Sequence, residues 1–468
     1  MPVVVTQGSD SGVSRARREP LSRAGRRLGL LPLICVMYLV ISGGAYGLED
    51  AVHIAGPKLA LLLCLLVPLT LSLPTGLMAA ELTALMPVEG GFYFWVKEGL
   101  GPFAGFAEAY FTMLYTAVDM AIYPVLFTSY LSFLMPISPA AQAILAVSIV
   151  WLAGLLNLAG IRPVGFASVL LAALLLSPMA ALVIAGLPRI VHFVTPAEPL
   201  FPSGFAGALG AGLTVVIWNF SGWENLSVVA GELEDAGRNY LRAILVTIPL
   251  VVAGYVLPLL VSVSGSVSVA HWRMGWFSHV GYAIGGPALG ASLAIGGALM
   301  AFSVFEAAML WVSRMPYVLA REGYLPRSLG EVWQATVAPW KSILVSCALF
   351  TLLVPLGFVA LVVLDVFFYM AALVLEMAAM VRLRRLRPAR DGMFTVGGGR
   401  FGLYLVAGFP VFTWLATFGL AMSHGDGHGD FLVAIALGAT VWPAYAITRR
   451  RYGGPAKLAD ELAATAEA

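Results

Sequence analysis

The sequence predicts an all-α integral membrane protein with twelve transmembrane helices. The first ten form a five-plus-five inverted repeat in which helices 1 and 6 are broken, and the last two are peripheral. Three observations predict this fold class: an apolar composition, the distribution of basic residues, and two helix breaks five spans apart. Of 468 residues, 60% are hydrophobic and only 11% are charged, which is too little charge to cover a soluble protein of this size.

Twelve apolar stretches supply the predicted helices. A helix needs about 20 apolar residues to cross the hydrocarbon core of a bilayer. In chain order the stretches are residues 28–54, 59–86, 103–134, 141–159, 164–187, 205–230, 241–264, 284–312, 342–356, 358–381, 402–422 and 430–448. The predicted organisation is a tail over 1–27, a first repeat over 28–190, a second repeat over 205–385, helices 11 and 12 over 402–448, and a tail over 449–468.

The basic residues favour an orientation with both termini in the cytoplasm. In that orientation 24 of the 27 Lys and Arg residues lie on the inner side, and only Lys58, Arg189 and Arg273 lie elsewhere. Such a bias is typical of multi-pass proteins, here of the plasma or cytoplasmic membrane. Residues 1–27 are Arg-rich without an apolar core, so we expect a cytoplasmic tail and no cleavable signal peptide.

Other classes of protein are disfavoured by what the sequence lacks. The net charge of +2 gives no indication of nucleic-acid binding, and Cys35, Cys64 and Cys347 show no disulfide or metal-ligand spacing. An intramembrane enzyme would need a catalytic pairing, a metal cluster or a nucleotide motif inside the spans, and none is found. We therefore expect no cofactor and no metal. A channel is also disfavoured, because broken helices predict a closed site at the midplane and no continuous pore.

Two spans are interrupted by small residues that precede acids. The first reads "SGGAYGLED" over 42–50, and the sixth reads "WNFSGWENLS" over 218–227. Unwound backbone is tolerated in a membrane only where it lines a cavity or is satisfied by a ligand, and glycine lets a ligand approach the backbone closely. Matching breaks in two halves of a chain are the sequence signature of a LeuT-like inverted-repeat transporter, with the substrate site between them.

Four motifs in the expected order resemble the amino acid–polyamine–organocation transporters. The first break looks like the glycine-rich substrate loop of that superfamily. The other three motifs are "MPVEGGFYFWVKEGLGPFAGF" over 86–106, "WNFSGWENLSVVAGELEDAGRNYLRAI" over 218–244, and "SRMPYVLAREGYLP" over 313–326. They are similar to the loop after span two, the sixth span with its following loop, and the loop after span eight. The resemblance covers nearly the whole chain.

Within the superfamily the chain most resembles the plant-type polyamine transporters, which are proton symporters. The segments that carry this likeness are "GGAYGLEDAV", "GLMAAELTALMPVEGGFYFWV", "AVDMAIYPVLF" and "LEMAAMVRLR". The resemblance implies proton-coupled uptake of putrescine- or spermidine-like polyamines by alternating access. One departure is Glu224, where that branch often has Asp, and it leaves the preferred substrate length open. The alternative is a cationic or broad-specificity amino acid transporter, a symporter or an exchanger, with the same fold.

The acids that follow the first break favour a cationic substrate. Glu49 and Asp50 lie in the first turn of the outer half of span one. Acids at a helix N-terminus stabilise the helix dipole by about 0.3–1 kcal/mol each, so helix capping is the structural alternative, especially for Asp50. A carboxylate here would oppose the carboxylate of an amino acid and attract an amine. We therefore include Glu49 among the candidate substrate ligands.

Asp119 lies midway along span three, and acids within spans are functional candidates. Tyr115 and Tyr123 stand four residues before and after it, on the same helix face. Aromatic rings also bind amines through cation–π contacts. A buried carboxylate bonded to a neighbouring helix is the structural alternative.

Three further candidates depend on the resemblance. It gives Glu224 a role in substrate binding and gating. It favours a substrate role for Glu306 over a structural pair with an Arg near the inner surface. Trp218 aligns with a tryptophan that occludes the substrate in related antiporters, with interfacial anchoring as the alternative. The full set of candidate substrate-binding residues is Ser42, Gly43, Gly44, Tyr46, Glu49, Asp119, Tyr123, Trp218, Asn219, Ser221, Gly222, Glu224 and Glu306.

The coupling ion is predicted to be a proton. A buried carboxylate can carry it, and Asp119 and Glu224 are the proton-coupling candidates. Sodium coupling stays an alternative, because Ser303 can supply a hydroxyl ligand. Some proton-coupled relatives use a lysine in span five, but residues 164–187 contain none.

The remaining acids and histidines are interpreted as structural. Glu81 lies near the inner end of span two. Asp365 and Glu376 lie in span ten, with Arg382 as the expected ion-pair partner near the inner surface. His271 and His279 are assigned to an outer loop. The second outer loop, "SHGDGHGD", contains His424, Asp426, His428 and Asp430 and is expected to be solvated and to bind no metal.

Overall fold

The structure is a computed structural model that describes most of the chain. It covers residues 29–86, 91–159, 166–191, 200, 204–227, 233, 235–264, 271–333, 336, 338–388, 392–423 and 428–453. The predicted tail over 1–27 and most of the predicted tail over 449–468 lie outside these residues, and so do His424 and Asp426. The regular elements of the described residues are all helices, and the bridge between Trp333 and Ala338 is isolated and part of no strand.

The first half of the chain forms the helices that the predicted spans 1–5 require. They are α2 (Leu30–Ile41), α3 (Glu49–Ala55), α4 (Pro57–Val67), the π-helical turn η1 (Pro68–Ser72), α5 (Leu73–Leu85), α6 (Gly91–Leu100), α7 (Pro102–Leu131), α8 (Pro139–Leu158) and α9 (Phe166–Val191). Helices α4, η1 and α5 together make one long span over 57–85.

The second half of the chain is also helical. Its helices are α10 (Phe205–Asn219), α11 (Ala236–Val263), α12 (Phe277–Val312), α13 (Arg314–Arg321), η4 (Arg327–Gly330), α14 (Trp340–Leu353), η5 (Val354–Leu356), α15 (Phe358–Leu386), α16 (Gly399–Ser423), α17 (His428–Ala439) and α18 (Val441–Tyr452). Helix α12 is non-helical at Gly285 and Gly286, so the predicted span over 284–312 corresponds to its second part.

Both predicted breaks are present, and glycine conformation explains them. Helix α2 ends at Ile41, and Gly43 and Gly44 then take φ angles of 56° and 96°. Helix α10 ends at Asn219, and Gly222 takes a φ angle of 90°. Side chains other than glycine rarely adopt such angles. The chain therefore leaves the helical path where these glycines occur.

Nine helical segments of the described residues are long and apolar enough to cross a membrane. Three shorter apolar helices, Leu30–Ile41, Phe205–Asn219 and Trp340–Leu356, occupy the places of predicted spans 1, 6 and 9. Spans 1 and 6 are short because each is interrupted by its break. The all-helical, multi-pass class is confirmed, whereas the count of twelve and the division into two inverted repeats stay predictions.

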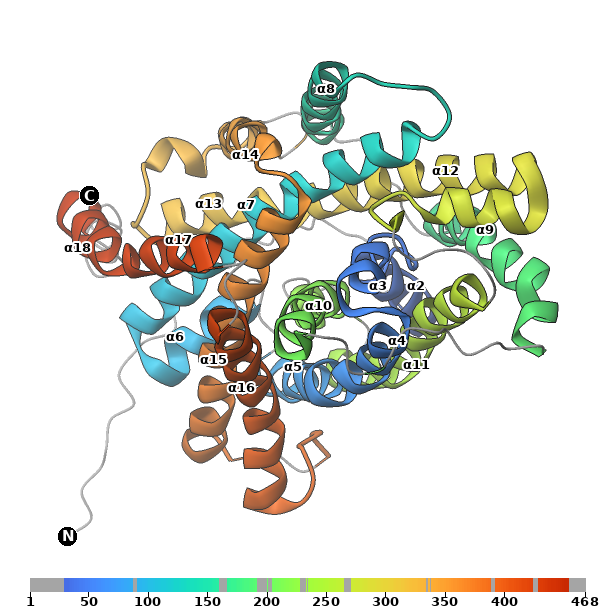
Figure 1. Cartoon of the computed structure of the whole chain (residues 1–468). Helices are drawn as coiled ribbons and strands as arrows, with labels where there is room; N and C mark the ends of the chain where they lie inside the picture. Colours follow the sequence, from blue (N-terminus) through green and yellow to red (C-terminus); the bar gives the residue numbers. More distant parts are fainter. Residues whose placement is uncertain are drawn as a thin grey trace, which may run out of the picture.

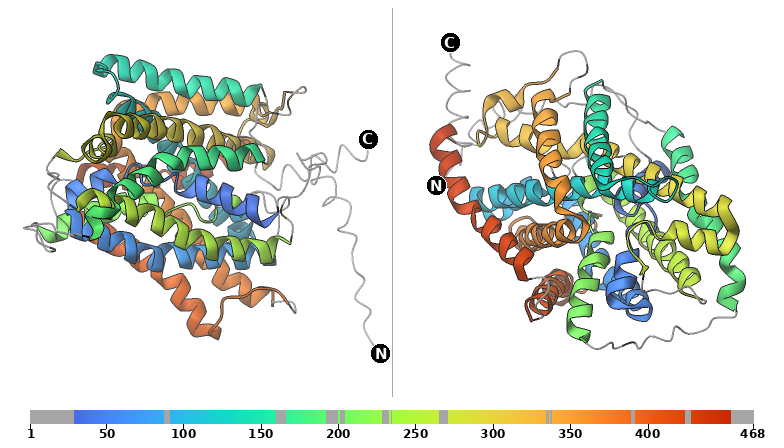
Figure 2. Two further views of the ribbon diagram at one scale, coloured as in Figure 1. Left: turned by 90° about the vertical axis from the view of Figure 1, so that its right-hand side faces the viewer. Right: turned by 45° about the horizontal axis from the view of Figure 1, so that its top comes forward.

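The two broken helices lie side by side in the middle of the bundle (Figure 1). Helix α10 packs against α3, α4, α15 and α16, and α2 packs against α11, α9 and α12. Helix α7 crosses the bundle between α12 and α15. Seen from the side, most helices run roughly parallel to one another (Figure 2). The breaks are therefore enclosed by other helices, as unwound backbone in a membrane requires.

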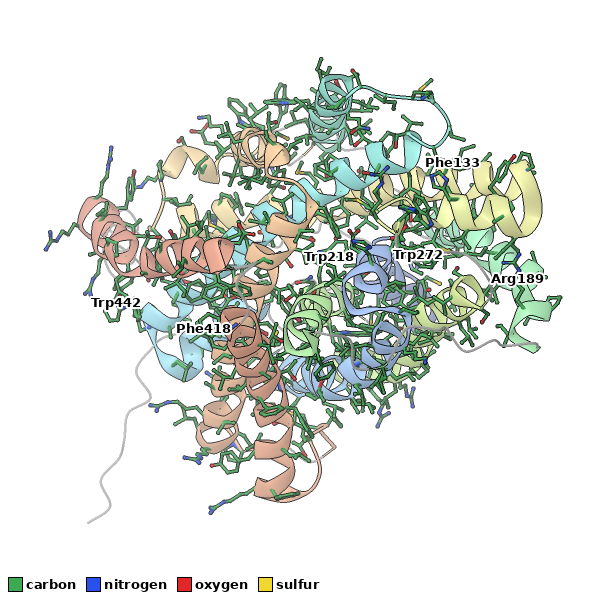
Figure 3. All side chains as sticks on the ribbon, in the orientation of Figure 1. Phe133, Arg189, Trp218, Trp272, Phe418 and Trp442 are labelled. Atoms are coloured by element: carbon green, nitrogen blue, oxygen red, sulfur yellow. The ribbon has the colours of Figure 1, made fainter. Side chains whose placement is uncertain are left out.

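The outer helices carry apolar side chains on their outward faces. Ile144 on α8, Leu352 on α14, Phe412 on α16 and Trp442 on α18 are all more than 60% exposed. Figure 3 shows Trp442 at the edge of the molecule and Trp218 near its centre. Apolar exposure over several helices marks a surface that contacts something other than water. A lipid bilayer is the contact that fits this surface.

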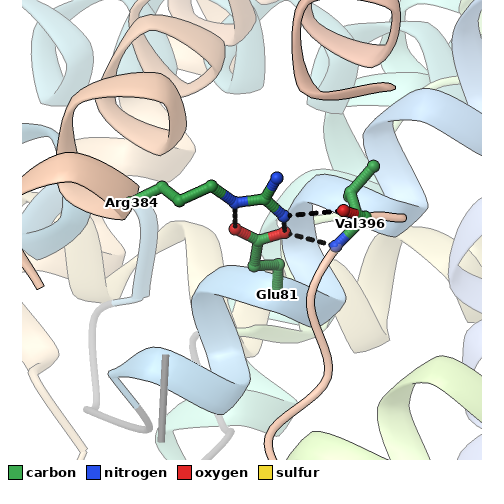
Figure 4. Close-up of polar contacts among 3 residues, drawn as sticks. All are labelled: Glu81, Arg384 and Val396. Carbon is green, nitrogen blue, oxygen red and sulfur yellow. Dashed lines mark hydrogen bonds and ion pairs between the residues drawn. The ribbon is translucent and has the colours of Figure 1, made fainter. Parts of the chain in front are cut away.

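Glu81 forms a buried ion pair that joins two spans (Figure 4). Arg384 on α15 donates through Nε to Glu81 Oε1 at 2.7 Å and through Nη2 to Oε2. The Val396 amide donates to the same Oε2 at 2.7 Å, and Arg384 Nη2 also donates to the Val396 carbonyl at 3.1 Å. Glu81 is only 3% exposed. The structural interpretation of Glu81 is thus confirmed, and its partner also fixes the segment before α16.

Candidate functional site

A cavity of about 70 Å³ lies where the two breaks face α7, α12 and α15. At roughly 10–15 Å³ per water it has room for several water molecules. Its lining residues are Leu39, Val40, Ile41, Ser42, Gly43, Tyr46, Tyr115, Asp119, Tyr123, Leu126, Trp218, Asn219, Ser221, Gly222, Asn225, Met300, Ala301, Val304, Ala308, Asp365 and Tyr369. This set combines unwound backbone, aromatic rings and two carboxylates, and it contains no Lys, Arg or His.

Asp119 projects from the middle of α7 into this cavity. Its Oδ2 accepts a hydrogen bond from the Tyr123 hydroxyl at 3.1 Å, and its Oδ1 accepts one from Trp218 Nε1 at 2.9 Å. Tyr115 also lines the cavity, but its hydroxyl donates to Asn225 Oδ1 at 3.3 Å and makes no bond to Asp119. Of the two tyrosines predicted to share a helix face with Asp119, only Tyr123 bonds to it.

Asp365 on α15 faces the same cavity and was interpreted from the sequence as structural. It is 3% exposed, and its Oδ1 has no hydrogen-bond partner in the described structure. It interacts electrostatically with Asp119. Two carboxylates on one enclosed cavity repel each other unless a cation or a proton lies between them. A cationic ligand would satisfy both.

Trp218 occupies the centre of the molecule, at the end of α10 (Figure 3). Its ring lies 5.5 Å from that of Phe358 and 6.4 Å from that of Tyr123, centroid to centroid. A Cβ atom added at Gly47 would lie 2.8 Å from Trp218 Cζ3. The glycine after the first break is thus needed for the tryptophan at the second break to lie against it.

Side-chain hydroxyls join the backbone of the two breaks. Tyr255 of α11 donates to the Asn219 carbonyl at 2.8 Å and is 3.2 Å from the Ser42 carbonyl. The Tyr369 hydroxyl accepts the Gly222 N–H at 3.1 Å. These contacts satisfy part of the opened backbone, and the cavity exposes the remainder to a ligand.

Glu49 does not reach the cavity. It is fully buried at the start of α3, where it accepts hydrogen bonds from the Tyr130 hydroxyl, from Gly47 N at 2.7 Å and from Gly275 N at 3.2 Å. It thus links the first break to α7 and to the segment before α12. This geometry fits a structural anchor, and it gives the predicted substrate contact no direct support.

We expect Glu49→Gln to lower the thermal stability of the purified protein. The amide keeps the size of the side chain but loses the charge to which three donors bond, and hydrogen bonds to charged groups contribute about 1.5–3 kcal/mol. A thermal unfolding scan in detergent measures the change. Unchanged stability together with lost substrate binding would instead return Glu49 to the substrate site.

The remaining candidates divide clearly between the cavity and its surroundings. Those that line it are Ser42, Gly43, Tyr46, Asp119, Tyr123, Trp218, Asn219, Ser221 and Gly222. Those that do not are Gly44, Glu49, Glu224 and Glu306. Glu224 lies behind Tyr369, whose hydroxyl donates to its Oε2 at 3.1 Å. Glu306 Oε1 faces Asn157 Nδ2 of α8 at 3.4 Å.

Sequence reasoning missed several groups of the site. Asp365, Tyr369 and Asn225 line the cavity, and Tyr255 braces it. The expected ion pair between Glu376 and Arg382 is wrong, because Glu376 is buried and makes no ion pair with a described residue. A signal was present: residues 365, 369 and 376 recur at spacings of four and seven, which places them on one helix face.

The histidine-containing segments give no metal centre among the described residues. His279 stacks on Trp276 with ring centroids 4.4 Å apart, and the His271 ring is 6.3 Å from the same tryptophan.

These features define a multi-pass membrane protein that encloses a polar cavity between two broken helices. The sequence profile described as amino acid permease matches residues 28–441. The chain therefore belongs to the amino acid permease family, within the amino acid–polyamine–organocation superfamily. The resemblance stated from the motifs is confirmed.

Several relatives carry transporter names. The chain is 30% identical over 436 residues to Polyamine transporter PUT1 of Oryza sativa subsp. japonica, covering 92% of this chain and 81% of the relative. It is 30% identical over 389 residues to Polyamine transporter RMV1 of Arabidopsis thaliana, covering 81% and 78%. It is 26% identical over 293 residues to Asc-type amino acid transporter 1 of Mus musculus, covering 57% and 53%.

Proposed function

We propose that the protein is a secondary active transporter that takes up polyamines of the putrescine and spermidine class, coupled to protons, by alternating access. The observation that carries the proposal is the pair of carboxylates, half-buried Asp119 and buried Asp365, on a cavity whose described lining residues include no cation. An ammonium group supplies the missing charge, and the rings of Tyr123 and Trp218 can hold the adjacent methylenes or stabilise the cation. The names of the plant relatives support the same substrate class.

The proposed arrangement includes the orientation drawn from the basic residues. Both termini face the cytoplasm, and the protein lies in the plasma or cytoplasmic membrane. Spans 1–5 and 6–10 are the two halves that move relative to each other around the cavity. Asp119 and Glu224 stay the candidates from the sequence for the coupled proton.

A cationic or broad-specificity amino acid transporter is the second candidate. Glu49 is bonded away from the cavity, so it does not repel a carboxylate bound there. The backbone at Ser42, Gly43 and Gly222 lines the cavity and can bind both ends of an amino acid. The relative named as an Asc-type amino acid transporter agrees with this reading.

Uptake by the purified protein in proteoliposomes separates the two candidates. Labelled putrescine, spermidine, arginine and leucine are each supplied with an inward proton gradient, with a sodium gradient, and with neither. We expect proton-driven accumulation of the polyamines and no uptake of leucine. Uptake of arginine or leucine without polyamine uptake would establish the amino acid transporter, and accumulation that needs only sodium would refute proton coupling.

A further inference from the structure

Three carboxyl groups are buried together beside the cavity but outside it. Glu108 comes from α7, Glu224 from the segment after α10, and Glu376 from α15, and their exposed fractions are 0%, 1% and 3%. Glu108 and Glu376 each interact electrostatically with Glu224, and Glu376 also interacts with Glu108. None of the three lines the cavity. We call Glu108, Glu224 and Glu376 the acid cluster.

The acid cluster has too few partners for three negative charges. Glu108 Oε1 accepts from the Thr112 hydroxyl at 2.7 Å, and Glu224 Oε2 accepts from Tyr369. Glu108 Oε2 and Glu376 Oε2 are buried with no partner in the described structure. Each is an acceptor or, if protonated, a donor that lacks its counterpart. A buried polar atom in this condition is costly.

No cation among the described residues neutralises the acid cluster. The other titratable groups that face it are hydroxyls: Tyr115, Tyr369, Tyr240 on α11 and Tyr93 on α6. The basic side chains on neighbouring elements are engaged elsewhere, Lys97 with Glu322 and Arg384 with Glu81. Like charges that are buried away from water repel one another strongly. Three ionised carboxylates here would be strongly destabilising.

The ligand that fits such a place is a proton. The described residues present no group of acids placed to hold a metal ion, and the unpartnered oxygens lie outside the cavity, where a polyamine cannot reach them. A proton needs no volume, and protonation of one carboxyl group removes its repulsion with the others. We propose that the acid cluster holds the proton that is coupled to transport. The coupling role of this proton rests on the proposed function. The presence of a bound proton in the acid cluster does not.

Tyr369 connects the acid cluster to the substrate cavity. Its ring lines the cavity, and its hydroxyl accepts the Gly222 N–H and donates to Glu224 Oε2. If Glu224 gains a proton, its carboxyl group no longer needs the Tyr369 hydroxyl as a donor. Protonation therefore changes the support of the second break directly. Substrate and proton would act on the same two-state element, as coupling between two sites requires.

A second set of polar groups lies on the Tyr93 side of the acid cluster. Glu108 interacts electrostatically with Tyr93, whose hydroxyl donates to Glu322 Oε2 at 3.2 Å. Glu322 pairs with Lys97, and the two side chains are 11% and 17% exposed.

The first test is transport by Glu108→Gln, Glu376→Gln and the double variant in proteoliposomes. Glutamine imitates a permanently neutral carboxyl group. We expect loss of proton-driven accumulation, while exchange of labelled against unlabelled spermidine continues at close to the wild-type rate. Glu98→Gln is the matched control, because Glu98 is 46% exposed and pairs with Arg387 at the surface. Wild-type accumulation in both single variants, or equal loss of accumulation, exchange and spermidine binding, would overturn the proposal.

The second test needs no substrate, so it stays decisive if polyamines prove not to be transported. Infrared difference spectra between acid and alkaline pH report protonated carboxyl groups through their C=O band. We expect wild-type protein to show a band that disappears as the pH rises, and Glu108→Gln or Glu376→Gln to remove or shift it. A spectrum unchanged by both variants would show that the cluster holds no proton, even if polyamine uptake is observed. The single variants serve if the double variant does not fold.

Discussion

Asp365→Asn is expected to weaken spermidine binding about 10- to 100-fold. Of the two carboxylates on the cavity, Asp119 already accepts hydrogen bonds from Tyr123 and Trp218, whereas Asp365 Oδ1 has no partner among the described residues. The unsatisfied oxygen is the one best placed to accept from an ammonium group. A hydrogen bond to a charged group contributes about 1.5–3 kcal/mol, and each 1.4 kcal/mol corresponds to a factor of ten in affinity.

The control for this effect is leucine, a ligand that carries a carboxylate beside its ammonium group. Isothermal titration of the purified protein with spermidine and with leucine separates charge recognition from damage to the fold. If leucine binds, its affinity should change far less than that of spermidine, and Glu98→Gln should alter neither. An equal loss for both ligands would make Asp365 a structural residue. An unchanged spermidine affinity would remove the carboxylate pair from the proposal.

Asp119→Asn should weaken spermidine binding in two ways: through the lost charge and through a changed position of Trp218. The Trp218 indole donates to Asp119 Oδ1, so this variant also disturbs the ring that lies over the cavity. Because the two carboxylates share one cavity, the losses in Asp119→Asn and Asp365→Asn should not add in the double variant. Additive losses would mean that the two acids bind different groups.

Local patterns in the sequence predicted the two helix breaks and one of the two cavity carboxylates, Asp119. Gly43, Gly44 and Gly222 interrupt apolar stretches, and their positive φ angles are what such a pattern predicts. Asp119 was recognisable because an acid within a span is expensive. Both features depend only on the residues close by in the chain. A single sequence contains that local information.

Contacts between distant segments were not predictable in the same way. Glu49 does lie in the first turn of the helix after the break, as predicted, but its charge is turned toward Tyr130 and Gly275. Glu376 was matched with Arg382 by proximity in the chain, although residues six apart do not share a helix face. Which acid meets which base is decided by helix packing, and Arg384 accordingly pairs with Glu81 on α5.

Glu81→Ala is expected to destabilise the protein by about 3–5 kcal/mol, because removing one partner of a buried ion pair leaves the other charge unpaired. Arg384 would lose both oxygens to which it donates and would keep only the Val396 carbonyl. Val396 N would also lose its acceptor. Thermal or denaturant-induced unfolding, followed by tryptophan fluorescence in detergent, measures the effect.

The exposed pair between Glu98 on α6 and Arg387, the residue that follows α15, provides the comparison. Both side chains are 46% exposed, so Glu98→Ala should cost no more than about 1 kcal/mol. Arg384→Met in the Glu81→Ala background should recover part of the loss, since no buried charge is then left without a partner. If Glu81→Ala unfolds like the wild type, the junction of α5 and α15 is held by apolar packing alone. If the second substitution deepens the loss, Arg384 stabilises the junction chiefly through Val396.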